Sequence, residues 1–124
     1  MRVKNIVLAI KSEEEFTKEV KDVMKNISRD VKSEPESIIS YESLEVMRKF
    51  ITDERLRILK TIKKEHPSSI YALAKTLKRD TKNVSNDVNY LAELGLIELR
   101  KIKEGRKKTI PTVNYDKILL EIAV

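Results

Sequence analysis

The stretch from residue 68 to residue 97 constrains the fold of this chain more than any other. Its apolar residues recur at three- and four-residue spacing in two short runs, which is the periodicity of amphipathic helices. The first run comprises Ile70, Leu73, Ala74 and Leu77, and the second comprises Val84, Val88, Leu91 and Leu94. The polar residues 78–80 predict a turn between them, with Asp80 or Thr81 as the N-cap of the second helix. Gly95 is expected to end that helix in a left-handed conformation, and a strand is expected from Leu96. Helices this short must share a core, so we expect a helix-turn-helix.

The outer face of the second predicted helix is rich in asparagine, which is a poor helix former. The residues expected to point away from the apolar face are Lys82, Ser85, Asn86, Asn89 and Glu93, and Asn83, Asn86 and Asn89 form a slanting stripe. The candidates for the major groove of DNA are Lys82, Asn83, Ser85, Asn86 and Asn89. An asparagine amide donates and accepts hydrogen bonds together, which suits the edge of a base in the major groove of DNA. The alternative interpretation is a solvated helix face that happens to carry asparagine.

A basic hairpin is predicted directly after these helices, over residues 97–113. Apolar and polar residues alternate from Ile97, Glu104-Gly105 predicts the turn, and Pro111 confines the returning strand to an edge or a bulge. The cationic side chains near the tip are Lys101, Lys103, Arg106, Lys107 and Lys108. The order of helix and hairpin is explained if the helix enters the major groove of DNA while the hairpin lies along its phosphates. Further candidates for contacts with the DNA backbone are Ser68, Ser69 and Tyr71. An ordinary hairpin with a charged tip is the alternative.

The spacing A-x-x-L-x(6)-V-x-x-x-V-x-x-L-x-x-x-G-L-I, from Ala74 to Ile97, resembles that of winged helix-turn-helix transcription regulators. More narrowly, residues 41–115 are similar to archaeal regulators of the MarR-like class. The resemblance implies the fold and DNA binding, and it specifies neither an operator nor a ligand. Lys78 departs from the pattern, because many such motifs have glycine in the turn. Since a positive φ costs a non-glycine residue about 1 kcal/mol, a different turn geometry is expected here.

Composition excludes several classes of protein. The 124 residues contain no cysteine, which excludes disulfides, thiolate metal sites and thiol redox chemistry. No 18-residue apolar run and no signal peptide is visible, so a cytoplasmic location is expected. Residues 1–51 hold ten basic and ten acidic residues, whereas residues 52–124 hold 16 and 10. The whole excess of positive charge therefore lies in the half with the helix-turn-helix, which indicates a polyanionic partner rather than a membrane.

The first 40 residues are expected to form a strand-helix arm. Residues 1–10 favour a strand, and Ser12 with Glu15 forms a capping-box pattern. The apolar spacing from Phe16 to Val31 predicts a long amphipathic helix that Pro35 breaks. The acidic residues 13–15 are interpreted as the first turn of that helix rather than as a metal site. Residues 37–41 are expected to be an extended link.

The expected fold class is α+β, mainly α. It consists of a winged helix-turn-helix domain with the N-terminal strand-helix arm before it and a C-terminal strand after it. A helix is expected over residues 44–51, and a second one runs from a Thr52 N-cap to His66-Pro67, with Leu56, Leu59 and Ile62 in the core and Ile58 beside them. The end of the chain predicts a strand, with a short helix over 115–120 as the alternative. The two terminal strands are expected to pair with each other or across a dimer. The expected domains are 1–40, for dimerisation, and 41–124, for DNA binding.

A homodimeric, sequence-specific regulator that binds double-stranded DNA is the function that these features predict. An antitoxin that represses its own operon and holds a toxin through the N-terminal arm is the main alternative. A winged helix used for protein contacts is disfavoured, because residues 82–89 are neither apolar nor acidic. An enzyme is disfavoured because no catalytic, cofactor-binding or metal-binding spacing is found. A small-molecule effector stays open, with Tyr41, Tyr71, Tyr90 and Tyr115 as possible lining residues.

Overall fold

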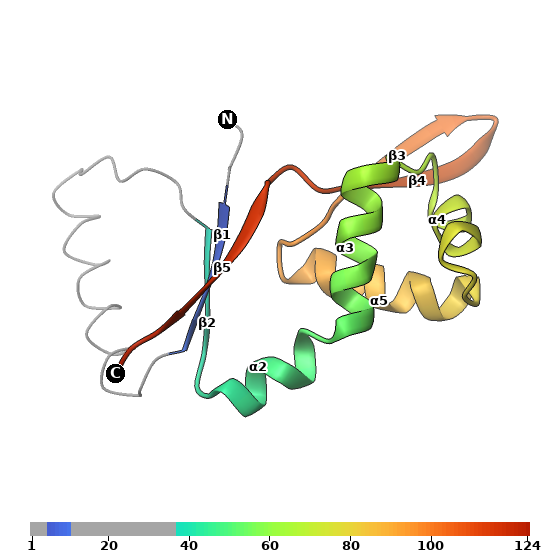
Figure 1. Cartoon of the computed structure of the whole chain (residues 1–124). Helices are drawn as coiled ribbons and strands as arrows, with labels where there is room; N and C mark the ends of the chain where they lie inside the picture. Colours follow the sequence, from blue (N-terminus) through green and yellow to red (C-terminus); the bar gives the residue numbers. More distant parts are fainter. Residues whose placement is uncertain (1–4, 11–36) are drawn as a thin grey trace, which may run out of the picture. The chain divides into compact units, whose positions relative to one another are not determined.

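The computed structural model describes residues 5–10 and 37–124, with the side chains of residues 37, 104 and 106 excepted. These residues form four α-helices and two small β-sheets (Figure 1). They belong to two compact units, of which the first contains Met1–Phe50 and Tyr115–Val124 and the second contains Ile51–Asn114. The helix expected over residues 12–31 and the break at Pro35 lie outside the described residues.

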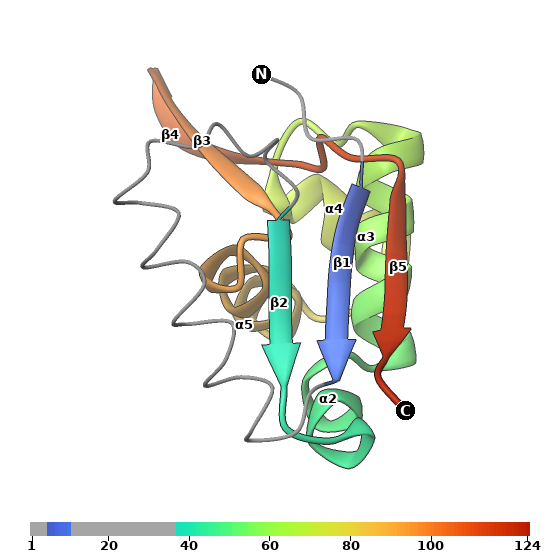
Figure 2. The same ribbon diagram turned by 90° about the vertical axis from the view of Figure 1, so that its left-hand side faces the viewer.

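Three parallel strands form the sheet of the first unit, in the order β2-β1-β5 (Figure 2). They are β1 (Asn5–Ile10), β2 (Ser37–Tyr41) and β5 (Lys117–Ile122). In the register, Val7 of β1 lies opposite Ile38 of β2 and Leu119 of β5. The central strand of a parallel sheet is covered on both faces, which explains why β1 is an unbroken apolar run. Its side chains from Ile6 to Ala9 are all buried.

The strands expected at the two ends of the chain are therefore present, and they pair with each other within one chain. The alternative helix over residues 115–120 is wrong, since β5 occupies this stretch. The expectation of a mere extended link at residues 37–41 is also wrong, because this segment pairs with β1 as a strand. Residues 41–50 and 115–124, which the sequence grouped with the helix-turn-helix, belong to the first unit. Residues 115–124 do so because β5 pairs with β1, and residues 41–50 because β2, on which α2 packs, pairs with β1 as well.

Helix α2 (Leu44–Phe50) follows β2 in the first unit. The side-chain oxygen of Ser43 accepts a hydrogen bond from the backbone N–H of Val46 at 3.1 Å, which caps the first turn. Met47 is buried, and the ring of Phe50 stacks on that of Tyr41 with 6.2 Å between the centroids. These contacts hold the short helix against β2, and they account for the apolar spacing that predicted it.

Three capped helices build the second unit: α3 (Asp53–Glu65), α4 (Ile70–Leu77) and α5 (Thr81–Glu93). Each begins where a side-chain oxygen accepts from a backbone N–H three residues later. Thr52 caps α3 at 3.2 Å, Ser69 caps α4 at 3.0 Å and Asp80 caps α5 at 3.2 Å. The predicted caps Thr52 and Asp80 are thus confirmed.

One apolar core joins these three helices, because each turns a buried stripe toward the other two. The buried residues are Ile58, Leu59 and Ile62 of α3, Leu73, Ala74 and Leu77 of α4, and Val84, Val88 and Leu91 of α5, together with Leu96, Ile97 and Pro111. The sequence placed Leu56 in this core and Ile58 beside it, whereas Ile58 is fully buried and Leu56 is half-buried.

Two left-handed residues shape the connections of α4 and α5. Lys78 has φ 56° and ψ 44°, so the expectation of another geometry in this turn is wrong. The turn is held by backbone hydrogen bonds, in which the N–H of Arg79 donates to the carbonyl oxygen of Ala74 at 3.1 Å. Gly95, with φ 85°, follows α5 as predicted. The strand after it begins at Glu98 instead of Leu96, because Leu96 and Ile97 are buried in the helical core.

Strands β3 (Glu98–Glu104) and β4 (Arg106–Thr112) form an antiparallel hairpin after α5. Gly105, with φ 75°, supplies the turn. Pro111 lies opposite Leu99 in this two-stranded ribbon, where both strands are edges, so its missing N–H disrupts no further ladder. The hairpin expected from the sequence is confirmed.

Candidate nucleic-acid interface

The exposed face of α5 carries the predicted base-reading residues. Val84, Val88 and Leu91 are fully buried, which fixes the rotation of the helix about its axis. The opposite side exposes Lys82, Asn83, Asn86 and Asn89, with Ser85 half-buried beside them. We call these five residues the α5 outer face. Its amides can donate and accept hydrogen bonds in pairs, which is the chemistry that reads adenine in a major groove.

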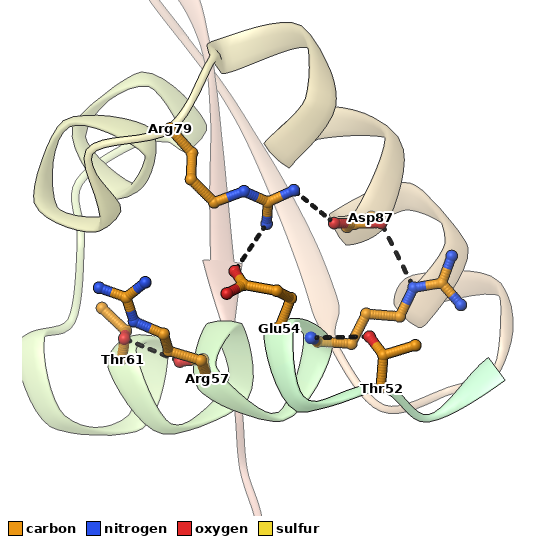
Figure 3. Close-up of polar contacts among 7 residues, drawn as sticks. Thr52, Glu54, Arg57, Thr61, Arg79 and Asp87 are labelled. Atoms are coloured by element: carbon orange, nitrogen blue, oxygen red, sulfur yellow. Dashed lines mark hydrogen bonds and ion pairs between the residues drawn. The ribbon is translucent and has the colours of Figure 1, made fainter. Parts of the chain in front are cut away.

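The sequence analysis missed an ion-pair cluster that joins Asp87 of α5 to Arg79 and Glu54 (Figure 3). Asp87 of α5 accepts from the Nε atom of Arg55 at 3.3 Å and from the NH2 atom of Arg79 at 3.1 Å. The NH1 atom of Arg79 lies 3.6 Å from the carboxylate of Glu54. The guanidinium of Arg55 also lies 4.3 Å from the centroid of the Tyr90 ring. We call these five residues the Asp87 cluster.

The Asp87 cluster connects three elements of the second unit: the first turn of α3, the turn after α4, and α5. The side chains of Arg55, Asp87 and Arg79 are 21%, 19% and 25% exposed, so their charges are only partly solvated. Ion pairs of this kind are stronger than fully exposed ones, because water screens them less. The cluster therefore fixes the direction in which α5 presents its outer face.

The sequence carried one signal of this cluster. At 3.6 residues per turn, Asp87 lies only about 60° from Val84 around the helix, on the flank of the apolar face. A carboxylate at such a position needs a cationic partner. The partners could not be identified, because Arg55 lies on another helix and pairing across the core is not a local pattern.

The hairpin presents exposed lysines on both of its faces. Lys103 lies opposite Lys107, and Lys101 opposite Thr109, so these three lysines share one face. Lys108 lies opposite Ile102 and hence on the other face. The side chain of Arg106, which the sequence grouped with them, lies outside what the structure describes. Like charges directly opposite each other destabilise a hairpin, and a bound polyanion would relieve the repulsion between Lys103 and Lys107.

The start of α4 contributes the remaining candidates. Ser69 is occupied as the N-cap, so its oxygen accepts from the N–H of Ala72, while Ser68 is exposed. Tyr71 is exposed, and the Nζ atom of Lys75 lies 5.3 Å from the centroid of its ring. Lys75 and Lys78 are exposed cations that the sequence analysis did not include. They extend the positive surface of the second unit along α4.

The charge of the chain is concentrated in the second unit. Residues 52–124 carry the whole net charge of +6. Within that range Asp116, Lys117 and Glu121 belong to the first unit and sum to −1, which leaves +7 for the second. The cations of the Asp87 cluster are paired with carboxylates, so the exposed lysines of α3, α4, α5 and the hairpin supply most of this field. A surface of this kind attracts polyanions.

Residues 5–10 and 37–124 offer few other features that could carry chemistry. No group of His, Asp and Glu side chains in these ranges is arranged to hold a metal ion. No helix in the same ranges is both long and apolar enough to cross a membrane. His66 is an exposed C-cap residue of α3 with φ 48°. Burial raises the pKa of the Tyr115 phenol above its usual value, which keeps this group neutral.

The four tyrosines considered as an effector site have separate surroundings. Tyr41 stacks on Phe50 and Tyr115 is buried in the first unit, whereas Tyr71 and Tyr90 belong to the second. Within the second unit, Tyr71 is exposed on α4 and the ring of Tyr90 is covered by Arg55. Tyr71 therefore contacts Lys75 and Tyr90 contacts Arg55, so the two rings have different neighbours within this unit.

The fold and site so far define a basic three-helix unit with a hairpin. Comparison with known proteins places it further: the family model HVO_A0114 matches residues 50–120, and the chain belongs to this family. No curated protein matches the chain. A solved structure that matches is the transcriptional regulator homologue protein from Pyrococcus horikoshii OT3, at 17% identity. That match covers 56% of this chain and 76% of the other with a TM-score of 0.44, values too low to assign a function.

Proposed function

We propose that this protein is a sequence-specific transcriptional regulator that binds double-stranded DNA as a homodimer. In this proposal the second unit is a MarR-like winged helix-turn-helix, with α4 and α5 as the helix-turn-helix and the β3–β4 hairpin as the wing. The observation that carries the proposal is the α5 outer face, which exposes Asn86 opposite a fully buried apolar stripe, with Asn83 and Asn89 exposed on either side of it. A helix so oriented can enter a major groove with hydrogen-bonding side chains toward the bases.

Each part of the second unit has a role in this mechanism. Asn83, Asn86 and Asn89 read base edges, and Lys82 at the start of α5 meets a phosphate. The lysines of the hairpin, at positions 101, 103, 107 and 108, bind phosphates of the adjacent backbone together with Arg106. Ser69 and Tyr71 at the start of α4 contact the backbone on the other side of the groove. Phosphate contacts set the position of the protein, and base contacts set the sequence preference.

The Asp87 cluster supports this mechanism without touching DNA. Because Asp87 binds both Arg55 and Arg79, the asparagines of α5 are held at a fixed angle to the rest of the unit. A rigid recognition helix loses less conformational entropy on binding, which favours a high affinity.

The proposal is tested by selecting bound duplexes from a random DNA pool with the full-length protein. We expect a motif with two half-sites about 10 base pairs or a multiple of this apart, as a two-fold dimer requires. The matched control is the variant Asn83→Ala, Asn86→Ala and Asn89→Ala, which should still retain DNA at low salt but enrich no motif. Failure of the unmodified protein to enrich any motif would contradict the proposal.

A further inference from the structure

Strand β5 exposes apolar side chains on both faces of its sheet. Leu119 is 44% exposed, and Leu120 and Ile122 are each 50% exposed. Neighbouring residues of a strand point to opposite faces, so Leu119 and Leu120 leave both sides of β5 open to water. Strand β1 next to it is buried throughout from Ile6 to Ala9. Parallel sheets are normally covered on both faces, and β5 is the strand of this sheet that departs furthest from that rule.

The outer edge of β5 is also open. Within residues 5–10 and 37–124 the sheet has the order β2-β1-β5, so β5 pairs with no strand on its outer side. The N–H of Ala123 donates to the carbonyl oxygen of Ile10 at 3.5 Å. Odd-numbered residues of β5 therefore direct their backbone groups toward β1, and even-numbered residues direct theirs outward. An unprotected apolar edge of this kind is a template for another strand.

We infer that two copies of this chain associate through antiparallel pairing of their β5 strands, with the two-fold axis at Leu119. The two three-stranded sheets then become one continuous sheet of six strands. A two-fold axis requires each strand to pair with the same strand of the other copy, which makes the pairing antiparallel. Leu119 lies opposite the partner's Leu119, and Ile118 lies opposite Leu120 of the partner subunit.

Charge complementarity selects this register. With the axis at Leu119, Lys117 faces the partner's Glu121, and by symmetry this pair forms twice. An axis at Leu120 would instead place Leu119 opposite the partner's Glu121. An axis midway between two residues is excluded, because opposing residues of an antiparallel pair must both direct their backbone groups outward or both inward. Opposite charges directly across a pair stabilise a sheet, as do apolar neighbours.

This interface deepens the homodimer part of the proposed function, on which it rests, and it does not depend on DNA binding. The second copy is the partner that the surface fits, because the self-pairing of Lys117 with Glu121 gives the strand complementarity to itself. A different protein that covered β5 would not need to place Leu119 opposite a second Leu119. Crosslinking at the two-fold axis therefore distinguishes a second copy of the chain from another partner.

The first test uses the absence of cysteine from the chain. Leu119→Cys places one thiol in each copy at the axis, in a pair whose Cα atoms are about 4.5 Å apart, within the range of a disulfide. Ile122→Cys is the matched control, because it is equally exposed but lies about 20 Å from its copy in this register. Mild oxidation of the full-length protein should give a covalent dimer for Leu119→Cys and none for Ile122→Cys. Equal crosslinking of the two variants, or none of Leu119→Cys, overturns the proposed register.

The second test exchanges the charges. Lys117→Glu and Glu121→Lys each create two like-charge pairs across the axis, so each should raise the dimer dissociation constant by roughly fivefold or more. The double variant Lys117→Glu/Glu121→Lys restores both pairs and should dimerise as the unmodified protein does. Sedimentation equilibrium measures the constants, and circular dichroism verifies that each variant is folded. Additive weakening in the double variant, or a monomeric unmodified protein at micromolar concentration, overturns the inference.

The two proposals fail in different ways. Loss of crosslinking and of charge dependence, with motif selection intact, overturns the β5 interface and leaves the DNA-binding function standing. A crosslinked β5 dimer that enriches no DNA motif overturns the DNA-binding function and leaves the β5 interface standing.

Discussion

Asn86 lies on the exposed side of α5, and its amide can donate one hydrogen bond and accept another. If it pairs with an adenine, its loss should cost about 1–3 kcal/mol of discrimination. Asn86→Ala should therefore weaken binding to the selected motif far more than binding to random DNA. The dependence of affinity on salt should not change, because no phosphate contact is removed. Fluorescence anisotropy with both duplexes over a range of salt measures these quantities.

The stability of this variant provides the control. Alanine is a better helix former than asparagine by a few tenths of a kcal/mol, so the free energy of unfolding should not fall. An equal loss of affinity for the selected motif and for random DNA would mean that Asn86 contacts the DNA backbone and not a base. Unchanged affinity for both would remove it from the interface.

Lys78 is a second residue at which the local chemistry makes a quantitative prediction. Its φ of 56° costs a non-glycine residue about 1 kcal/mol, whereas glycine adopts this conformation freely. Lys78→Gly should therefore raise the free energy of unfolding by up to about 1 kcal/mol, reduced by the greater freedom of glycine in the unfolded chain. Lys78→Ala is the control, because it removes the same charge and keeps the Cβ atom. An equal gain for alanine in urea denaturation would show that the lysine side chain, and not backbone strain, is responsible.

At the scale of elements, the Asp87 cluster is expected to hold α3, α4 and α5 together. Asp87→Ala removes the carboxylate that the partly buried guanidinium groups of Arg55 and Arg79 share, so it should lower the free energy of unfolding by about 2 kcal/mol. Glu54→Ala is the matched control within the same cluster. Its side chain is 56% exposed and its ion pair is longer, so it should cost less than about 1 kcal/mol. Equal effects of the two substitutions would mean that the cluster does not couple the helices through Asp87.

The hairpin is expected to act through phosphates. Lys103→Ala with Lys107→Ala removes two cations that face each other across the strands. Each phosphate contact adds about 0.9 to the slope of log affinity against log salt, so the slope should fall by up to about 1.8 for each subunit bound to the DNA. Affinity should fall alike for the selected motif and for random DNA. Lys60→Ala with Lys64→Ala removes the same charge from exposed positions on α3 and should change the slope less. If both pairs change the slope equally, the effect is one of net charge alone.

Most helices, caps and hairpin strands of the second unit could be predicted, because periodicity and capping are local properties of a sequence. Asp80 precedes α5 and caps it, and Pro111 lies in an edge strand, as their chemistry requires. Strand β2 was missed because five residues such as 37–41 become a strand only when β1 pairs with them. The Asp87 cluster was missed for the same reason. The turn at Lys78 was mispredicted because the cost of its conformation is smaller than the gain from packing α4 against α5.

The same distinction decides what the sequence could say of the candidate site. The outward direction of Asn86 follows from the buried Val84 and Val88, so the α5 outer face was predictable from spacing alone. The pairing of Lys103 with Lys107 depends on the register of the hairpin. The turn at Gly105 sets this register, but the sequence alone does not say how many residues the turn takes up. The exposed Lys75 beside Tyr71 was omitted because single lysines on a helix carry no pattern.

For the whole molecule, our two proposals assign dimerisation to the first unit and DNA binding to the second. The second unit has its own apolar core and the excess of positive charge, while the first has the parallel sheet, in which β5 pairs on its outer side with no strand among the described residues. Association through the first unit and DNA contact through the second would then respond to different substitutions. At 14.4 kDa per chain, the monomer and the dimer differ twofold in mass, and sedimentation distinguishes them readily.

Deletion of residues 1–33 tests this separation directly. It removes β1, the central strand of the sheet, so that β2 and β5 lose the strand with which both pair. The core of the second unit draws on residues from Ile58 to Pro111 and is not shortened. We expect the truncated chain to lose dimerisation or solubility while the helical signal of α3, α4 and α5 persists in circular dichroism. Loss of that signal together with dimerisation would mean that the sheet and the helices fold as one cooperative body, and the assignment of separate tasks to the two units would have to be abandoned.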